Sequence, residues 1–259
     1  MVFDQGNGPP VVVVPGIQGR WEWAKPTLRQ LSRHCRAISY SLSGDIGSRR
    51  RFDPDLGFEN YVRQLDDVLD EAGLDRVALC GISFGGYVAL RYAARRPDRV
   101  SALVLASVPG PSWRPNPRQA DWLGHPWAAA PTFVMTSPLR VWPEVSAAFP
   151  AVSARLWFLV RQGLRCAAAP MLPPLMASRV QNAAAVDFQE DCGKVRAATL
   201  VLSGEESLDR VVPVPSTRAY ASLIPGAEYL MLHRTGHMGL LTRPDRFAEI
   251  VTGFVHAHS

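Results

Sequence analysis

The stretch Gly81-Ile82-Ser83-Phe84-Gly85-Gly86 lies between an apolar run, residues 77–80, and a segment of helical character that begins at Tyr87. This order predicts a strand, a sharp turn and a helix, with Ser83 on the turn. Side chains at positions 81 and 85 would collide with the neighbouring strand and helix, and glycine removes those collisions. Ser83 would then stand at the carboxyl edge of a sheet, where the N–H groups of the following helix attract negative charge. The pattern therefore makes Ser83 a candidate nucleophile.

In this setting, the Gly-x-Ser-x-Gly pattern resembles the nucleophile elbow of the α/β-hydrolase family. The alternative interpretation is a glycine-rich turn that only closes a strand–helix unit or cradles a phosphate. The sequence has neither a P-loop lysine nor a G-x-G-x-x-G run, so the phosphate-binding alternative is disfavoured. The resemblance implies that Ser83 is joined by an acid and a histidine from later in the chain.

Two later motifs follow strand-like runs in the order that this family keeps. Asp209 and Pro213 follow the apolar run 198–203 and match the family's G-x-x-D-x-x-x-P, although the spacer from Gly204 is longer. Thr235-Gly236-His237 follows the last predicted strand, where the family places its histidine. The resemblance therefore implies a triad of Ser83, Asp209 and His237. The longer spacer leaves Glu205 and Glu206 open as alternatives for the acid.

The β-branched run Val11–Val14 ends in Pro15-Gly16, which predicts a buried strand followed by a turn. The family commonly has His-Gly-x-x-Gly here, and this chain has Pro15-Gly16-Ile17-Gln18-Gly19, with proline in place of histidine. The resemblance implies an oxyanion hole made by the backbone N–H groups of Ile17 and Phe84. Because these donors belong to the backbone, the proline need not remove them.

The alternation of strand-like and helix-like segments predicts an α/β fold with a mostly parallel, doubly wound sheet that is covered on both faces. Strands are expected at 11–14, 36–40, 76–80, 100–106, 198–203 and 227–232, and helices at 21–35, 58–72, 84–96 and 243–256. Residues 107–191 are rich in proline, with aromatic, Met and Leu residues between short helix-like pieces. We interpret this segment as a helical cap inserted into a core of residues 1–106 and 192–259. We expect it to roof an apolar pocket shaped by Trp157 and Phe158.

Composition excludes several other classes of protein. The net charge of +5 comes from scattered arginines, with Lys25 and Lys194 the only lysines, and no nucleic-acid module is present. The N-terminal segment resembles no secretory signal, and no stretch is long and apolar enough to span a membrane. The four cysteines show no C-x-x-C spacing, which favours reduced structural thiols over zinc ligands. We expect a soluble, cytoplasmic protein without nucleic-acid or membrane partners.

The resemblance implies a serine hydrolase that needs no metal or other cofactor and cleaves carboxylic esters of small to medium, largely apolar substrates. Lactones, and carbon–carbon bonds of dienoic ketones, are cleaved with the same triad and remain alternatives. A haloalkane dehalogenase is disfavoured because it would carry aspartate at the position of Ser83. A hypothesis of another class is a non-catalytic small-molecule receptor on the same fold.

Overall fold

The computed structural model describes residues 2–259, apart from the side chain of Arg118. Its centre is a seven-stranded sheet with the order β1-β3-β2-β4-β5-β6-β7. Strand β1 pairs antiparallel with β3, and every other pair of neighbours in the sheet is parallel. The strands are β1 (Val2–Gln5), β2 (Pro10–Val14), β3 (Arg36–Tyr40), β4 (Val77–Ile82), β5 (Val100–Ala106), β6 (Ala198–Ser203) and β7 (Glu228–Met231).

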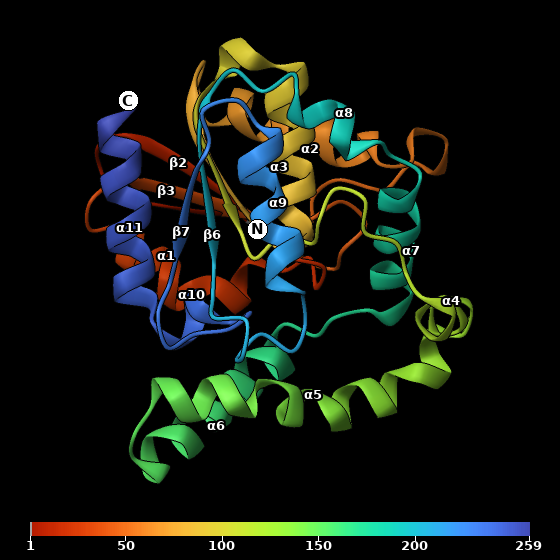
Figure 1. Ribbon diagram of the computed structural model, residues 1–259. Coiled ribbons are helices and arrows are strands. Elements are labelled where there is room, and N and C mark those ends of the chain that lie inside the picture. The colour runs from red at the N-terminus through yellow and green to blue at the C-terminus, as the bar shows by residue number, and fades with distance from the viewer. Residues whose placement is uncertain (1) are drawn as a thin grey trace.

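Helices cover both faces of this sheet (Figure 1). One face is covered by α1 (Lys25–Leu31), α10 (Gly239–Thr242) and α11 (Pro244–Ala257). The other is covered by α2 (Glu59–Glu71), α3 (Phe84–Arg95), α8 (Phe188–Cys192) and α9 (Val214–Leu223). Three short 3-10 helices are Trp21–Ala24, Pro54–Leu56 and Pro97–Arg99. The predicted α/β fold with a mostly parallel, doubly wound sheet is therefore confirmed.

The strands are apolar on both faces because each face has its own helical layer. In β2, Val12 and Val14 belong to the core cluster beneath α2 and α3, whereas Val11 and Val13 belong to the cluster beneath α1 and α11. Successive side chains of a strand point to opposite faces, so a continuous β-branched run supplies both cores.

Two elements differ from the sequence expectation. The segment 21–35 is not one helix: a 3-10 turn, Trp21–Ala24, precedes α1, and Pro26 lies in the first turn of α1. Proline has no N–H to donate to a preceding carbonyl, so it is tolerated in the first turn of a helix, and α1 begins beside it at Lys25. The edge strand β1 was not predicted, because Phe3 is the only buried residue among its four and gives no clear alternation.

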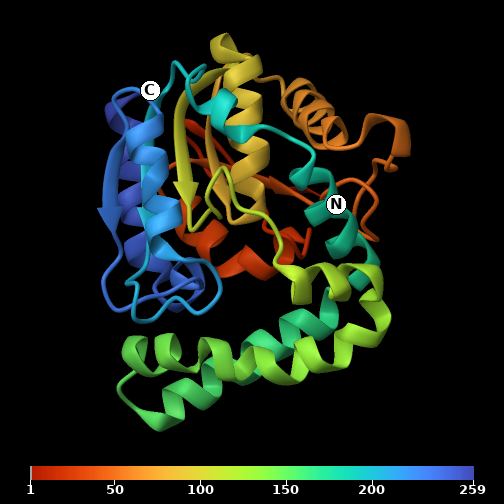
Figure 2. The ribbon, with the colours of Figure 1, turned by 45° about the vertical axis from the view of Figure 1, so that its right-hand side comes forward.

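Between β5 and β6 the chain forms α4 (Pro117–Gly124), α5 (Pro126–Ala148), α6 (Val152–Ala168), α7 (Pro173–Ala184) and then α8. In Figure 2 the arrows of the strands point toward α5 and α6, which cross beyond the carboxyl ends of the sheet. The short helix α8 instead joins the core, where Phe188 stacks on Tyr87 with ring centroids 4.2 Å apart. None of the helices in residues 2–259 has the length and apolar character needed to cross a membrane.

The four cysteines are free thiols, and Cys35, Cys80 and Cys192 are buried. Cys80 lies in β4, just before the turn that carries Ser83. Burial raises the pKa of the Cys80 thiol to about 12 and that of Cys35 to about 11. These thiols are therefore protonated near neutral pH and act as small apolar side chains.

Candidate active site

Ser83 lies on the turn between β4 and α3 with φ 51° and ψ −119°, a conformation that costs free energy for any residue with a side chain. The flanking glycines make this turn possible. A Cβ atom at position 81 would lie 2.5 Å from the Cα of Gly86, and one at position 85 would lie 2.3 Å from the carbonyl oxygen of Val14. Both distances are to backbone atoms, so neither clash could be relieved by a rotamer change. The turn holds Ser83 at the carboxyl edge of the sheet.

Asp209 and His237 are brought together from the loops that follow β6 and β7. The Nδ1 atom of His237 lies 3.4 Å from Oδ2 of Asp209, and the Asp209 side chain is 2% exposed. The other carboxylate oxygen, Oδ1, accepts the N–H groups of Val211 and Val212 at 2.8 and 2.9 Å. These two bonds orient the carboxylate, so that its remaining oxygen faces the imidazole.

The two alternative acids lie elsewhere. Glu205 uses Oε1 to accept the N–H of Arg234 at 2.8 Å, and the same oxygen lies 3.6 Å from Nδ1 of His233. Glu206 is exposed to solvent. Of the three candidate carboxylates, Asp209 is the one in contact with His237.

Within residues 2–259, no hydrogen bond joins Ser83 and His237. Ser83 is half-buried and lines the large cavity beneath the cap. His237 has a 16% exposed side chain and lies with Ser107 around a smaller, adjacent cavity. The Ser83 N–H donates to the carbonyl of Ala106, the residue before Ser107, at 2.8 Å. Both residues therefore lie near the end of β5. Catalytic hydrogen bonds are often long without substrate and tighten when it binds.

The N–H groups of Ile17 and Phe84 have no hydrogen-bond acceptor within the described part of the chain. Phe84 is the first residue of α3, where a helix leaves its N–H groups without an intrahelical partner. Ile17 follows β2, and both residues line the cavity that Ser83 lines. These positions fit the donors that the sequence resemblance implies.

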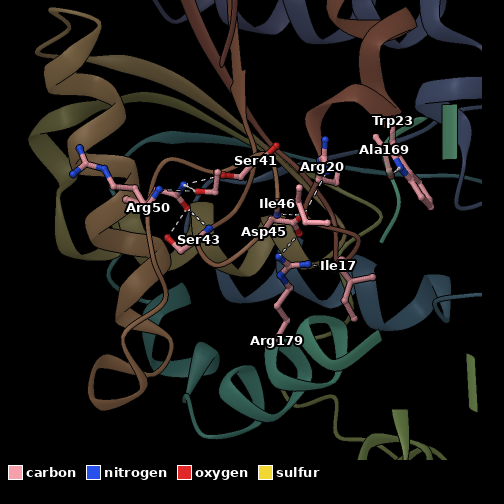
Figure 3. Close-up of polar contacts among 12 residues, drawn as sticks. Ile17, Arg20, Trp23, Ser41, Ser43, Asp45, Ile46, Arg50, Ala169 and Arg179 are labelled. Atoms are coloured by element: carbon pink, nitrogen blue, oxygen red, sulfur yellow. Dashed lines mark hydrogen bonds and ion pairs between the residues drawn. The ribbon is translucent and has the colours of Figure 1, made fainter. Parts of the chain in front are cut away.

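A buried arginine, whose role no sequence motif indicates, holds the Ile17 loop. Arg179, on α7, is 1% exposed and donates through Nη1 to the carbonyl of Ile17 and through Nη2 to Oδ2 of Asp45, each at 2.8 Å. Figure 3 shows its guanidinium between these two partners. Gly19 makes room for it, because a Cβ atom there would lie 2.3 Å from Nη2. The cap thus fixes the loop that presents the Ile17 N–H.

The cavity beneath the cap has a volume of about 410 Å³, within the usual range for small-molecule sites. Ile17, Ser83, Phe84 and Tyr87 line its core side, and α4, α5 and α7 supply most of the cap side. Its lining is mainly aromatic and aliphatic. Arg140 is the only charged residue among the described lining residues, and its guanidinium lies 5.8 Å from the ring centre of Phe133.

The expectation for Trp157 and Phe158 is wrong. Neither residue is among those that line the cavity, to which α6 contributes none of the described lining residues. Trp157 is 62% exposed, and Phe158 packs against Phe149 with ring centroids 5.1 Å apart. The cap does roof the cavity, but through Trp122, Phe133 and Met176 of the neighbouring helices.

A sheet of this topology, with an inserted helical segment over a serine on a strained strand–helix turn, defines an α/β-hydrolase architecture. The chain matches the Alpha/beta hydrolase family over residues 11–250, and it belongs to that family.

Known proteins with different activities resemble the chain. It is 31% identical to 2-hydroxy-6-oxo-2,4-heptadienoate hydrolase of Pseudomonas putida, over 99% of this chain and 92% of that protein. A thermophilic esterase from Thermogutta terrifontis has a similar structure, with TM-score 0.78, 22% identity and coverage of 100% and 94% of the two chains. The enol-lactonase of Burkholderia xenovorans matches with TM-score 0.75, 21% identity and coverage of 99% and 96%. The family makes this protein a hydrolase, and these relatives are named as a dienoate hydrolase, an esterase and a lactonase.

Proposed function

We propose that the protein is a serine hydrolase that cleaves carboxylic esters through Ser83, His237 and Asp209. The observation that carries this proposal is the contact of the Asp209 carboxylate with His237 Nδ1, at the sheet edge where the strained turn presents Ser83. The 3.4 Å separation is an ion-pair contact without a hydrogen bond. In the proposed mechanism, Asp209 favours the imidazole tautomer with the proton on Nδ1, which leaves Nε2 to accept the proton of the Ser83 hydroxyl.

Each step of the proposed reaction has a group to perform it. The Ser83 oxygen attacks the acyl carbon while His237 accepts the hydroxyl proton, and Asp209 stabilises the resulting imidazolium. The negative charge on the former carbonyl oxygen is stabilised by the N–H groups of Ile17 and Phe84, where one such donor contributes about 3–4 kcal/mol. His237 then gives its proton to the leaving alcohol, and a water molecule, activated by the same histidine, releases the acid from Ser83.

The cavity supports substrates of small to medium size that are largely apolar. Its lining offers few polar groups besides Ser83, mainly Gln119 and Arg140 on the cap. An aliphatic or aromatic acyl group would replace water against Tyr87, Trp122 and Met176, and burial of apolar area would contribute about 25 cal/mol per Å².

A second candidate is hydrolysis of a carbon–carbon bond by the same three residues. It is favoured by the 31% identity to 2-hydroxy-6-oxo-2,4-heptadienoate hydrolase, which extends over nearly the whole chain. Lactone hydrolysis is a third candidate for the same site. These alternatives differ in the bond cleaved and share the nucleophile.

One experiment tests the proposal and its alternatives together. Wild type and Ser83→Ala would be assayed on p-nitrophenyl esters from acetate to dodecanoate, on a simple lactone, and on 2-hydroxy-6-oxo-2,4-heptadienoate. We expect ester turnover by the wild type and a loss of about 10⁴- to 10⁶-fold in kcat for Ser83→Ala. Turnover of the dienoate alone would assign the second candidate. Binding of these compounds without turnover would favour the receptor hypothesis over any hydrolase.

A further inference from the structure

Glu144 is a carboxylate of the cap that is buried against the loop carrying His237. It lies near the end of α5, where it and Val145 are the buried residues of that helix among those described, and its exposure is 1%. Its Oε2 accepts the N–H of Met238, the residue after His237, and its Oε1 accepts the hydroxyl of Thr242 in α10, each at 2.8 Å. Both carboxylate oxygens are therefore committed to the segment that begins at His237.

No arginine or lysine forms an ion pair with Glu144 within residues 2–259. Burial raises its pKa, and hydrogen bonds from the Met238 backbone, the Thr242 hydroxyl and the Gly236 backbone, together with the nearby His237, oppose that effect. A buried carboxylate without an arginine or lysine partner is costly and persists only where its hydrogen bonds are satisfied. The hydrogen bonds from Met238 and Thr242 thus compensate for burying this group.

The same end of α5 also holds the residues before His237. The Nε atom of Arg234 donates to the carbonyl of Ala147 at 2.9 Å, and Arg234 has a positive φ of 60°. The cap therefore binds the loop on both sides of the histidine.

The opposite side of the loop lies against the segment that carries Asp209. The N–H of Glu205 donates to the carbonyl of Thr235 at 2.8 Å, and a Cβ atom at Gly236 would lie 2.5 Å from the carbonyl oxygen of Leu208. The histidine loop is thus held between the Asp209 loop and α5. A shift of the loop by a fraction of an ångström would change the separation of His237 Nδ1 and Asp209 Oδ2.

We propose that Glu144 is a positioning residue through which the cap fixes His237 in line with Asp209. By accepting the Met238 N–H, Glu144 fixes the position of the loop, and the loop fixes the position of the imidazole. The inference rests on the proposed function, because positioning matters only if His237 is the base that activates Ser83. It makes the cap a part of the catalytic geometry as well as a roof over the substrate.

The test is the rate at which a fluorophosphonate labels Ser83. In this reaction, the Ser83 oxygen bonds to phosphorus, fluoride leaves, and His237 accepts the proton. Glu144→Ala removes the acceptor, so labelling and ester kcat should fall by about 10²-fold, as small misplacements of catalytic groups do, with KM nearly unchanged. Glu144→Gln retains an oxygen that can accept the Met238 N–H and should restore most of the rate. Gln162→Ala removes another buried polar side chain of the cap, far from the loop in sequence and contacts, and should label like wild type.

The outcomes distinguish a failure of the positioning role of Glu144 from a failure of the proposed function. Wild-type labelling of a folded Glu144→Ala overturns the positioning role and leaves the proposed function intact. An equal loss in Glu144→Gln also overturns it, because it would assign the effect to charge. If Glu144→Ala does not fold, Glu144→Asp, whose side chain is one methylene shorter, provides the same comparison. No labelling of the wild type itself would overturn the proposed function, and this inference with it.

Discussion

Asp209 is distinguished from its acidic neighbours by its contacts. Two backbone N–H groups and the imidazole of His237 surround its carboxylate, whereas Glu205 accepts from Arg234 and Glu206 faces solvent. A carboxylate held in this way can orient the histidine without moving when the substrate binds.

Replacing Asp209 by asparagine should therefore reduce ester kcat by about 10⁴-fold while the fold is retained. The amide can favour the wrong tautomer of His237, so Nε2 would no longer accept the Ser83 proton. Steady-state kinetics beside a circular dichroism spectrum would measure this, with Glu205→Gln as the matched control. Near-normal turnover in Asp209→Asn, together with loss in Glu205→Gln, would reassign the acid.

Residues within short motifs could be predicted from the sequence, and isolated residues could not. Ser83 and His237 each sit in a local pattern that follows a strand-like run, so their position at one sheet edge was predictable. Arg179 and Glu144 lie within helices of a segment where charged residues are normally solvated. Their burial depends on which part of the core each helix meets, and that information is not local in sequence.

The strand–turn–helix unit around Ser83 is the element that tolerates least change. At Gly85, a methyl group would meet the carbonyl oxygen of Val14 at 2.3 Å, and the neighbouring strand cannot move without disturbing the sheet. The turn is thus fixed by close backbone packing.

Gly85→Ala should consequently destabilise the protein by about 1–3 kcal/mol or more and abolish ester hydrolysis. Gly163→Ala provides the control, because position 163 lies inside α6 with no atom within 4 Å of the added methyl group. Alanine there should raise the free energy of unfolding by up to about 1 kcal/mol. Urea denaturation would measure both, and equal stability of the two variants would contradict this account of the turn.

The helices of the cap divide into those that line the cavity and one that does not. Phe133 of α5 lines it, while Trp157 of α6 is largely exposed. Sequence alone could not make this distinction, because both helices are rich in apolar and aromatic residues. The orientation of each helix over the core decides which of its faces meets the substrate.

We expect Phe133→Ala to shift the preferred acyl chain of p-nitrophenyl esters toward longer chains, because the truncation enlarges the cavity. Trp157→Ala should leave the preference unchanged. The ratio of kcat/KM between a short and a medium ester measures the shift. A change confined to Trp157→Ala would contradict the assignment of the lining.

In the whole molecule, buried charged residues join the cap to the core on both sides of the site. Arg179 of α7 binds Asp45 and the Ile17 carbonyl, and Glu144 of α5 binds the loop after His237. The core strands and flanking helices were predictable from periodic apolar patterns. The docking of the cap was not, since it depends on a few polar contacts between distant segments.

Arg179→Met should destabilise the protein by about 3–5 kcal/mol, because it leaves Arg20, at 3.8 Å, as the one remaining cationic partner of the buried Asp45 carboxylate among the described residues. For a chain of this length, that loss corresponds to a fall of about 10 °C in melting temperature. Calorimetry would measure it, and the double variant Arg179→Met/Asp45→Asn should recover part of the loss. A single variant as stable as the wild type would show that the pair does not hold the cap.

The central claim is that Ser83 is an activated nucleophile, and covalent labelling tests it most directly. Wild type and Ser83→Ala would be treated with a fluorophosphonate probe, and the modified residue would be located by peptide mass spectrometry. We predict stoichiometric modification of wild type at Ser83 and none in the folded Ser83→Ala variant. A folded wild type that remains unmodified, or one modified at another residue, would contradict the assignment of Ser83 as the nucleophile.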